Sequence, residues 1–453
     1  MIGFGQSWEK DIFPIQNSNT SIQIYSAKQT LDQGYIVTGV FDTLFTNLPW
    51  SASILEDGFV FLLRLDQQGD TIWSKLYLDA ESVGTSVVQT QDSSYVILGV
   101  KINPLDSLRY PFIMKTNPQG NTLWAKHYLW APSGFGPLDL HKEYDGGYSF
   151  AIGNILIKLD SQGDTLWTKN LYLNNIQRPG HLKNTLDSGY AFIEYLGSPF
   201  DSIWRSNLVK TDSEGDILWL KTYFPSDSLF LINGFNQTSD NGYIISVSKS
   251  QSSFDTVNVQ ILNNKNLLIK TDYQGDTIWT KTYDLSPFNT PFNYNAIINP
   301  QQTSDGGYVF AYAIYDTLSI NQLALRFVKT DYQGDTLWTK TIARDDTLTF
   351  NYEPVGLASD EVFFQTIDAG YFFAFNLAKA YTKEDARSYI WLIKTDGNGN
   401  ITSSFDLPII KSASKGQLIK IVDLLGRETK GKKKQPLFYI YDDGTVEKRL
   451  VIE

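Results

Sequence analysis

KTDYQGDTIWTKTY (residues 270–283) recurs almost unchanged as KTDYQGDTLWTKT (residues 329–341). Weaker copies start at residues 64, 115, 158, 210 and 394, so the motif occurs seven times. The order x–x–Gly–Asp suits a type I turn followed by a glycine in the left-handed region, which forms a β-bulge. The TIWTKTY segment after the turn alternates as a β-strand does. We interpret the motif as a hairpin between two strands.

A second signal, Asp–x–Gly–Tyr, alternates strictly with this motif. Its seven copies begin at residues 31, 91, 144, 186, 239, 304 and 367, at intervals of roughly 40 to 65 residues, the range of propeller repeats. Asp-Gly and Asn-Gly favour a tight hairpin because glycine accepts a positive φ without steric cost. Each repeat thus predicts four short antiparallel strands, and the chain is predicted to be all-β, a seven-bladed β-propeller. A solenoid is the alternative, although solenoids use shorter, more uniform repeats and capping units.

The first residues of the chain bear on how the ring closes. SWEKDIF (residues 7–13) has the Trp–x–Lys pattern of a fourth strand but precedes the first repeat, whereas the seventh repeat ends in ITSSF without Trp or Lys. We predict that residues 7–13 supply the outer strand of blade seven and leave no free edge. The predicted domains are the propeller, residues 1–405, and a linker with a small β-domain, residues 406–453.

Strand alternation assigns the connections to two faces. The turns between strands one and two and between strands three and four share one face, and both are tight. The longer, variable connections share the other face, and variation on a rigid scaffold is where recognition usually resides. Aromatic side chains there could stack on sugars or anchor a protein, or could instead cover blade edges. The candidate ligand-binding residues are Trp50, Trp130, Trp204, Phe288 and Tyr294.

The motif aspartates have two interpretations. Asp and Asn hydrogen-bond their own backbone at turns, and Asn117, Asn121 and Asn400 replace Asp in some copies. Calcium is the alternative, because Asp272 and Asp276 flank a glycine, but the ligand spacing of an EF-hand is missing. Turn chemistry is favoured; it accounts for 18 of the 49 acidic residues and requires no basic partner.

Composition excludes several classes of protein. The absence of cysteine excludes disulfides, thiolate metal sites and cysteine nucleophiles. The net charge of −11 disfavours a nucleic-acid partner. No run approaches the roughly 18 apolar residues of a transmembrane segment, and GxxxxGK[ST] is absent. The start, MIGFGQSWEKDIF, shows no leader peptide, so the chain is either cytosolic or lacks its leader.

No catalytic motif is recognisable. His127, His141 and His181 do not recur and show no HExxH spacing, which gives metal or triad catalysis little basis. The pair Asp345–Asp346 is interpreted as a solvated loop pair, since neighbouring side chains diverge. The motif tryptophans are expected to pack between blades, with a ligand-stacking ring as the alternative. We predict no catalytic residue, no metal and no cofactor other than the calcium alternative, and leave enzyme activity open.

The tail differs from the acidic body. Residues 406–453 hold ten Lys/Arg against seven Asp/Glu. The segments IKIVDLLG, PLFYIYDDG and TVEKRLVIE are strand-like, and KGKKKQ between the first two is either a solvated basic loop or a docking patch.

Residues 418–453 resemble the type A C-terminal sorting domain of type IX secretion cargo from Bacteroidota-like bacteria. The matching segments are IKIVDLLGRE (residues 419–428) and FYIYDDGTVEK (residues 438–448). The resemblance implies export by a cleaved leader, passage through the outer membrane by the type IX machinery, and tail removal with release or surface attachment. The sorting-signal residues it implies are Asp423, Leu425, Gly426, Arg427, Tyr439, Asp443, Gly444, Val446 and Lys448. Residues 7–405 resemble the secreted propeller-like repeat proteins that often carry this tail.

These observations lead to one favoured function and two alternatives. We expect a secreted or outer-membrane-surface binding or adhesion module that recognises a glycan or protein through the variable-loop face. The first alternative is a secreted hydrolase or lyase acting on polysaccharide at the mouth of the central channel. The second is an adhesin or matrix component without a small ligand.

Overall fold

A computed structural model describes two compact units, Met1–Leu407 and Pro408–Glu453. The residues that it describes are 7–12, 21–42, 58–77, 82–103, 105–106, 108–129, 139–171, 179–196, 205–223, 229–255, 258–283, 298–316, 322–343, 362–380, 386–401, 418–422, 436–441 and 446–450.

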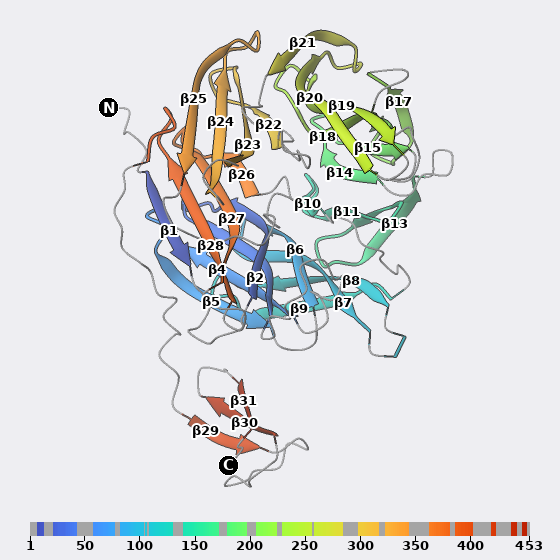
Figure 1. Cartoon of the computed structure of the whole chain (residues 1–453). Helices are drawn as coiled ribbons and strands as arrows, with labels where there is room; N and C mark the ends of the chain where they lie inside the picture. The colour runs from blue at the N-terminus through green and yellow to red at the C-terminus, as the bar shows by residue number, and fades with distance from the viewer. Residues whose placement is uncertain are drawn as a thin grey trace. The chain divides into compact units, whose positions relative to one another are not determined.

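The first unit is a seven-bladed β-propeller, which confirms the predicted fold class and blade number. Seven four-stranded antiparallel sheets surround a common centre, in chain order from blue to orange (Figure 1). Blades one to three consist of β2 Ser21–Gln29, β3 Tyr35–Asp42, β4 Gly58–Leu65 and β5 Thr71–Tyr77; β6 Ser82–Gln89, β7 Tyr95–Ile102, β8 Arg109–Thr116 and β9 Thr122–His127; β10 His141–Lys142, β11 Tyr148–Ile152, β12 Ile155–Leu159 and β13 Thr165–Asn170. Blades four to six consist of β14 Pro179–Asn184, β15 Tyr190–Leu196, β16 Arg205–Thr211 and β17 Ile217–Lys221; β18 Leu229–Gln237, β19 Tyr243–Asp255, β20 Asn258–Thr271 and β21 Thr277–Tyr283; β22 Ile298–Gln302, β23 Tyr308–Asp316, β24 Gln322–Thr330 and β25 Thr336–Ala343.

Blade seven takes its outer strand from the start of the chain. Its sheet order is β26 (Phe363–Gln365), β27 (Tyr371–Ala380), β28 (Ala386–Thr395) and β1 (Trp8–Ile12). β1 and β28 are antiparallel, with Trp8 opposite Lys394. First strands of neighbouring blades contact one another, as β2 does β6, and β2 also contacts β27 and β28. The last blade is therefore joined to the first.

The glycine of the opening motif has the conformation expected from the sequence. Gly275 has a φ of 78°, and a β-bulge shifts the register between β20 and β21. The Asp272 carboxylate accepts hydrogen bonds from the backbone N–H of Gln274 at 2.9 Å and of Asp276 at 2.8 Å. The equivalent glycines, also with positive φ, are Gly69, Gly120, Gly163, Gly215, Gly334 and Gly399.

The glycine of the Asp–x–Gly–Tyr signal has another role. In blade five, Asn241 has the positive φ, 64°, and Gly242 follows it. A Cβ on Gly242 would lie 2.1 Å from the carbonyl oxygen of Thr271 and 2.6 Å from Nζ of Lys270. The predicted positive φ of the Asp-Gly glycine is confirmed in blades three and six at Gly146 and Gly306, both at 84°, but not for Gly242, which is needed for close approach to the third strand.

Each outer strand holds the turn of the next blade. Between blades five and six, the Trp279 ring contacts Gly334, where a Cβ would come within 2.9 Å of the indole. Lys281 Nζ donates to Asp335 Oδ1 at 2.6 Å. Trp279 also meets Tyr308 edge-on, with 5.6 Å between ring centroids. We call this arrangement the clasp; it confirms that the motif tryptophans pack between blades.

The lysine contact of the clasp occurs at all seven blade interfaces. The residue pairs are Lys10–Asp70, Lys75–Asn121, Lys126–Asp164, Lys169–Asp216, Lys221–Asp276, Lys281–Asp335 and Lys340–Asn400. In the pair that joins blade seven to blade one, Trp8 contacts Gly69 and its Nε1 donates to the carbonyl oxygen of Gln67 at 2.9 Å. The N-terminal strand therefore makes the same contacts as the other outer strands.

Two blades depart from the expected long connection between strands two and three. In blade five, β19 and β20 run for 13 and 14 residues, so the chain continues as a hairpin. In blade three only Gly153 and Asn154 separate β11 from β12. Length on this side of the propeller is therefore specific to each blade.

The second unit contains a three-stranded antiparallel sheet. Its order is β29 (Leu418–Val422), β30 (Pro436–Tyr441) and β31 (Val446–Leu450).

Ring closure leads to the first prediction. Trp8 is 4% exposed, so Trp8→Ala should lower the free energy of unfolding by about 3–5 kcal/mol, the usual cost of truncating a buried aromatic ring. Guanidinium denaturation of the full chain would measure this. Leu123→Ala, at an exposed outer-strand position, should change it by less than about 0.5 kcal/mol. Equal midpoints for Trp8→Ala and the natural chain would contradict a closing role for β1.

Candidate functional site

The aspartate of each Asp–x–Gly–Tyr signal pairs with the basic residue near the end of strand three of its own blade. In blade five, Lys270 Nζ lies 2.9 Å from Asp240 Oδ2 and donates to the carbonyl oxygen of Thr271 at 2.6 Å. The lysine side chain is 4% exposed and the aspartate 55%. We call the full set the inner ring: Arg64–Asp32, Lys115–Asp92, Lys158–Asp145, Lys210–Asp187, Lys270–Asp240, Lys329–Asp305 and Lys394–Asp368.

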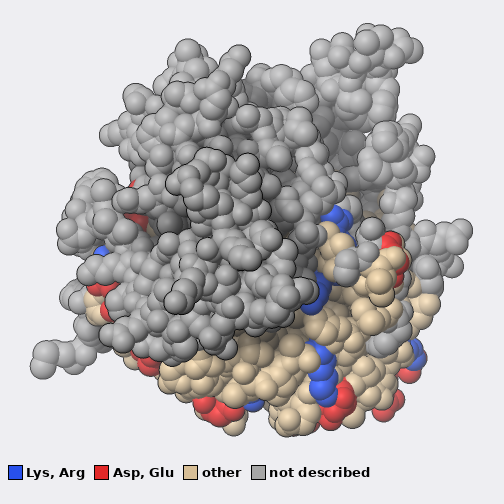
Figure 2. All heavy atoms as spheres, turned by 90° about the horizontal axis from the view of Figure 1, so that it is seen from below, with Lys and Arg blue, Asp and Glu red and all other residues tan. Residues whose placement is uncertain are grey.

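The expectation that the turn aspartates need no basic partner is therefore wrong. Inner-ring lysines and clasp lysines each bond a turn. On the part of the described surface seen in Figure 2, blue Lys or Arg atoms lie next to red Asp or Glu atoms. Burial alone would raise the pKa of Asp240, but hydrogen bonds from Lys270, Thr238 and a backbone N–H outweigh it and lower the pKa. Its paired lysine and these hydrogen bonds therefore favour the ionised form of Asp240 within the scaffold.

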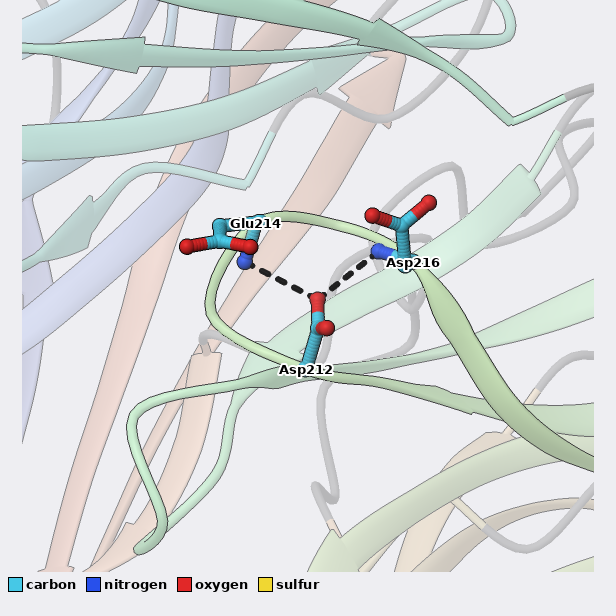
Figure 3. A group of neighbouring side chains, drawn as sticks. All are labelled: Asp212, Glu214 and Asp216. Atoms are coloured by element: carbon cyan, nitrogen blue, oxygen red, sulfur yellow. Dashed lines mark hydrogen bonds between the residues drawn. The ribbon is translucent and has the colours of Figure 1, made fainter.

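One group of carboxylates lies close enough together to suggest a cation site. Asp212, Glu214 and Asp216, in a turn of blade four, have oxygens within 4.8 Å of one another. Asp212 Oδ1 accepts hydrogen bonds from the N–H of Glu214 at 3.0 Å and of Asp216 at 2.8 Å (Figure 3). Asp216 also pairs with Lys169. In blade two the neutral Asn117 makes the equivalent turn bonds, so turn and clasp chemistry account for the arrangement.

Strand order separates two ends of the propeller. The tight turns lie at one end, which we call the turn face, and the remaining connections lie at the other, the loop face. The residues predicted to bind a ligand all belong to loop-face connections and lie outside the described residues: Trp50, Trp130, Trp204, Phe288 and Tyr294.

Glu194 is a buried carboxyl that the search for sequence motifs missed. It lies on β15 and is 2% exposed. Its cross-strand partner Asn207 donates to Glu194 Oε2 at 2.6 Å, and Thr222 donates to Asn207 Oδ1 at 2.6 Å. Burial raises the pKa of Glu194, and the hydrogen bond from Asn207 opposes only part of this effect. The fold therefore favours the protonated carboxyl more than water does.

The Glu194 position is apolar or glycine in the other six blades. Glu194 stands four residues after Tyr190, the tyrosine of the Asp–x–Gly–Tyr signal. The residues at the same distance after this tyrosine in the other blades are Gly39, Gly99, Ile152, Val247, Tyr312 and Phe375. The scaffold therefore does not require a carboxyl there. The signal in the sequence was a single Glu inside the otherwise apolar YAFIEYL strand.

The three histidines lie on different strands: His127 on β9, His141 on β10 and His181 on β14, the neighbour of the Glu194 strand β15. Burial, with a smaller effect from Lys101, lowers the pKa of His127. His141 Nε2 donates to the carbonyl oxygen of Leu182 at 2.6 Å, which links blade three to blade four. His181 precedes that leucine with a φ of 52°. Neither His141 nor His181 belongs to the carboxylate group described above.

Three residues of the suggested sorting signal lie on described strands. Tyr439 is in β30 opposite Glu447, while Val446 and Lys448 are in β31. The others lie outside the described residues: Asp423, Leu425, Gly426, Arg427, Asp443 and Gly444. In the part of the chain that is described, no helix is long and apolar enough to span a membrane.

The raised pKa of Glu194 predicts a distinctive pH dependence of stability. Folding favours its protonated form, so its unfavourable contribution grows as pH rises from the unfolded pKa, about 4.3, through the folded pKa. Glu194→Gln should match the natural chain near pH 4 and be more stable at pH 7, as measured by guanidinium denaturation across this range.

Asp240→Asn is the matched control with the opposite sign. In the natural chain the folded-state pKa of Asp240 is lowered. The stabilisation that the ionised carboxylate contributes is therefore present above the unfolded pKa and is lost as pH falls. This variant should be less stable than the natural chain at pH 7, with the difference shrinking in acid. If Glu194→Gln were also less stable than the natural chain at pH 7, the conclusion that folding favours the protonated Glu194 carboxyl would be wrong.

Comparisons with known proteins concern the fold only. No family model matches the chain, and no curated protein matches it. A streptogramin B lyase structure is 13% identical, with 85% of this chain and 98% of that chain covered at a TM-score of 0.43. A protein of unknown function from Dyadobacter fermentans is 8% identical, with coverage of 85% and 98% and a TM-score of 0.42. The Pan2 WD40 domain of Neurospora crassa is 9% identical, with coverage of 84% and 90% and a TM-score of 0.41. None of these similarities assigns an activity, and the chain is described by its architecture, a seven-bladed β-propeller built from a repeated sequence.

Proposed function

We propose that this propeller is a binding or adhesion module that recognises a glycan or protein through its loop face. The observation that carries the proposal is that the repeated polar residues of the turns are bonded within the scaffold. Both sets of turn aspartates are bonded within their own blade or to the neighbouring one, as in Lys270–Asp240 and Lys281–Asp335. Residues that serve the scaffold in every blade do not distinguish one ligand from another.

Specificity then comes from residues that differ between blades, and the loop face holds several of them. Blade five extends a long hairpin at this end, blade three has a two-residue link, and blade four buries Glu194. Aromatic side chains suit both candidate ligands because they combine a large apolar area with few rotatable bonds. Trp50, Trp130 and Trp204, with Phe288 and Tyr294, supply such side chains to the connections of this face.

The alternative function is a polysaccharide hydrolase or lyase, and Glu194 is the observation that favours it. A carboxyl with a raised pKa suits a general acid. Such an enzyme needs a second carboxyl or a histidine near the first. Among the described residues, the hydrogen-bond partner of Glu194 is the neutral Asn207. The binding module is therefore the better supported proposal.

A binding experiment tests the loop face. Trp50→Ala, Trp130→Ala and Trp204→Ala should each weaken binding to a ligand found by glycan array or by pull-down of surface proteins. A loss of about 2 kcal/mol, or some 30-fold in Kd, is typical for a central aromatic residue. Isothermal titration calorimetry would measure it. Leu123→Ala, on an outer strand, is the control. Unchanged affinity in all three tryptophan variants would exclude the proposed surface.

We further propose that the second unit is a type IX sorting signal that brings the propeller to the outer-membrane surface or the medium. The support is the resemblance of residues 418–453, together with a small β-sheet whose strands β30 and β31 carry Tyr439, Val446 and Lys448. The expected partner is the type IX machinery.

Export provides the test of this second proposal. In a host with an active type IX system, the chain fused behind a periplasmic leader should reach the surface or medium. Removal of residues 418–453 should retain it in the periplasm, as followed by cell fractionation and immunoblotting. A Lys411→Ala/Lys415→Ala variant, in the linker before residues 418–453, should export normally. Equal export with and without residues 418–453 would refute the sorting role.

A further inference from the structure

The turn face has a set of exposed apolar side chains that the scaffold does not use. The residue directly before the inner-ring aspartate is apolar in blades seven, one, three and four. These residues are Ile367, Leu31, Tyr144 and Leu186, and they are between 56% and 78% exposed. Scattered exposed apolar residues are ordinary on protein surfaces. Here, however, they occupy one equivalent position, in the turn between the first two strands, in four of the seven blades.

The same position is polar in the remaining blades. Gln91, Ser239 and Ser304 stand before the aspartate in blades two, five and six. The turn therefore forms without an apolar residue there. Folding of the blade does not explain why four copies expose one.

Hydrogen bonds between blades hold this position in place. The backbone N–H of Leu31 donates to Gln89 Oε1 of the next blade at 2.7 Å, and that of Leu186 donates to Gln237 Oε1 at 2.7 Å. Across the ring closure, the N–H of Ile367 donates to Gln29 Oε1 at 2.9 Å. Three of the four apolar side chains, Leu31, Leu186 and Ile367, are thus presented on a backbone bonded to the next blade, so a partner would not have to order these turns when it binds.

The charges beside them are arranged unequally. Each apolar residue is followed by an inner-ring aspartate, in the pairs Leu31-Asp32, Tyr144-Asp145, Leu186-Asp187 and Ile367-Asp368. Across the inner ring the aspartates are 26% to 66% exposed, whereas their basic partners are only 2% to 17% exposed. In each inner-ring pair the carboxylate faces water and the cation lies beneath it, so a partner that reaches these turns meets the carboxylates first.

We propose that the strand-one-to-two turns on the turn face form a second interaction surface, which binds a basic polypeptide segment carrying leucine or aromatic side chains. We call it the mouth surface, defined by Leu31, Tyr144, Leu186, Ile367 and the aspartates that follow them. Apolar side chains of the segment pack on these four residues, and its Lys or Arg side chains reach the exposed carboxylates. The surface disfavours phosphate-bearing partners such as nucleic acids and anionic membranes, because the same carboxylates repel them. This inference is independent of the loop-face proposal, since the two surfaces lie at opposite ends of the blades.

The test uses the full chain and synthetic peptides. A fluorescein-labelled octapeptide of alternating Arg and Leu is titrated with the protein and followed by fluorescence anisotropy. A second peptide of alternating Arg and Ser has the same charge without apolar side chains. The natural chain should bind the Arg–Leu peptide at least about tenfold more tightly, and added salt should weaken binding of both peptides.

The mouth variant replaces four residues by Ser at once: Leu31, Tyr144, Leu186 and Ile367. Serine is the natural residue at the equivalent position in blades five and six, as Ser239 and Ser304. It should lose at least about tenfold in affinity for the Arg–Leu peptide and keep its affinity for the Arg–Ser peptide. The matched control replaces four exposed outer-strand residues by Ser: Ile72, Leu123, Ile278 and Leu337. It should bind both peptides as the natural chain does.

Three results would overturn the proposal. They are no measurable binding of the Arg–Leu peptide by the natural chain, equal affinity for the two peptides, and equal losses in the mouth variant and the outer-strand control. Circular dichroism and the guanidinium midpoint of each variant establish that it is folded. The mouth substitutions are at exposed turn positions where serine occurs naturally in other blades. A failed loop-face experiment would leave these outcomes unchanged.

Discussion

The structure depends on the clasp, in which the outer strand of one blade holds the turn of the next. The tryptophan lies where a side chain on the turn glycine would be, and the lysine reaches the residue that follows the glycine, as Trp279 and Lys281 do on Gly334 and Asp335. This single contact explains several features of the repeat. The glycine allows both the positive φ and the close approach of the indole, the residue after it must be Asp or Asn, and the outer strand must carry Trp–x–Lys.

Closure follows from the same constraint. The end of the seventh repeat, ITSSF (residues 401–405), lacks Trp and Lys, and β1 supplies both to the last interface through Trp8 and Lys10. A tryptophan buried against the next blade contributes much more than the accompanying lysine pair, because the aspartate of that pair is exposed and such ion pairs are weak. The lysine and the carboxylate mainly fix which turn residue meets which strand. The repeated residues thus stabilise the ring, and the two ends of the blades are free to carry different chemistry.

Much of the fold was accessible from the sequence because turn chemistry is local. Gly275 and its equivalents predict a left-handed turn from only a few neighbouring residues, and the seven copies of the turn motif predict the number of blades. What was missed depends on partners far along the chain. Lys10 and Asp70 are 60 residues apart, and no pattern within one repeat shows that they meet. Likewise, only the approach of the Thr271 carbonyl oxygen explains why Gly242 must be a glycine. Glu194 was visible as an acidic residue in an apolar strand, but its burial became clear only once Asn207 and the blade around it were placed.

The central claim is that seven equivalent interfaces make one closed ring in which the N-terminal strand is a full member. Native-state hydrogen exchange of the full chain tests it most directly, because the exchange of a backbone amide reports the free energy of the opening that exposes it. If the claim holds, hydrogen-bonded amides of β1 will be as well protected as those of the other outer strands, such as β5 and β21, to within about tenfold in exchange rate. Exchange of β1 amides at the rate of a fraying terminus, while β5 and β21 remain protected, would contradict it.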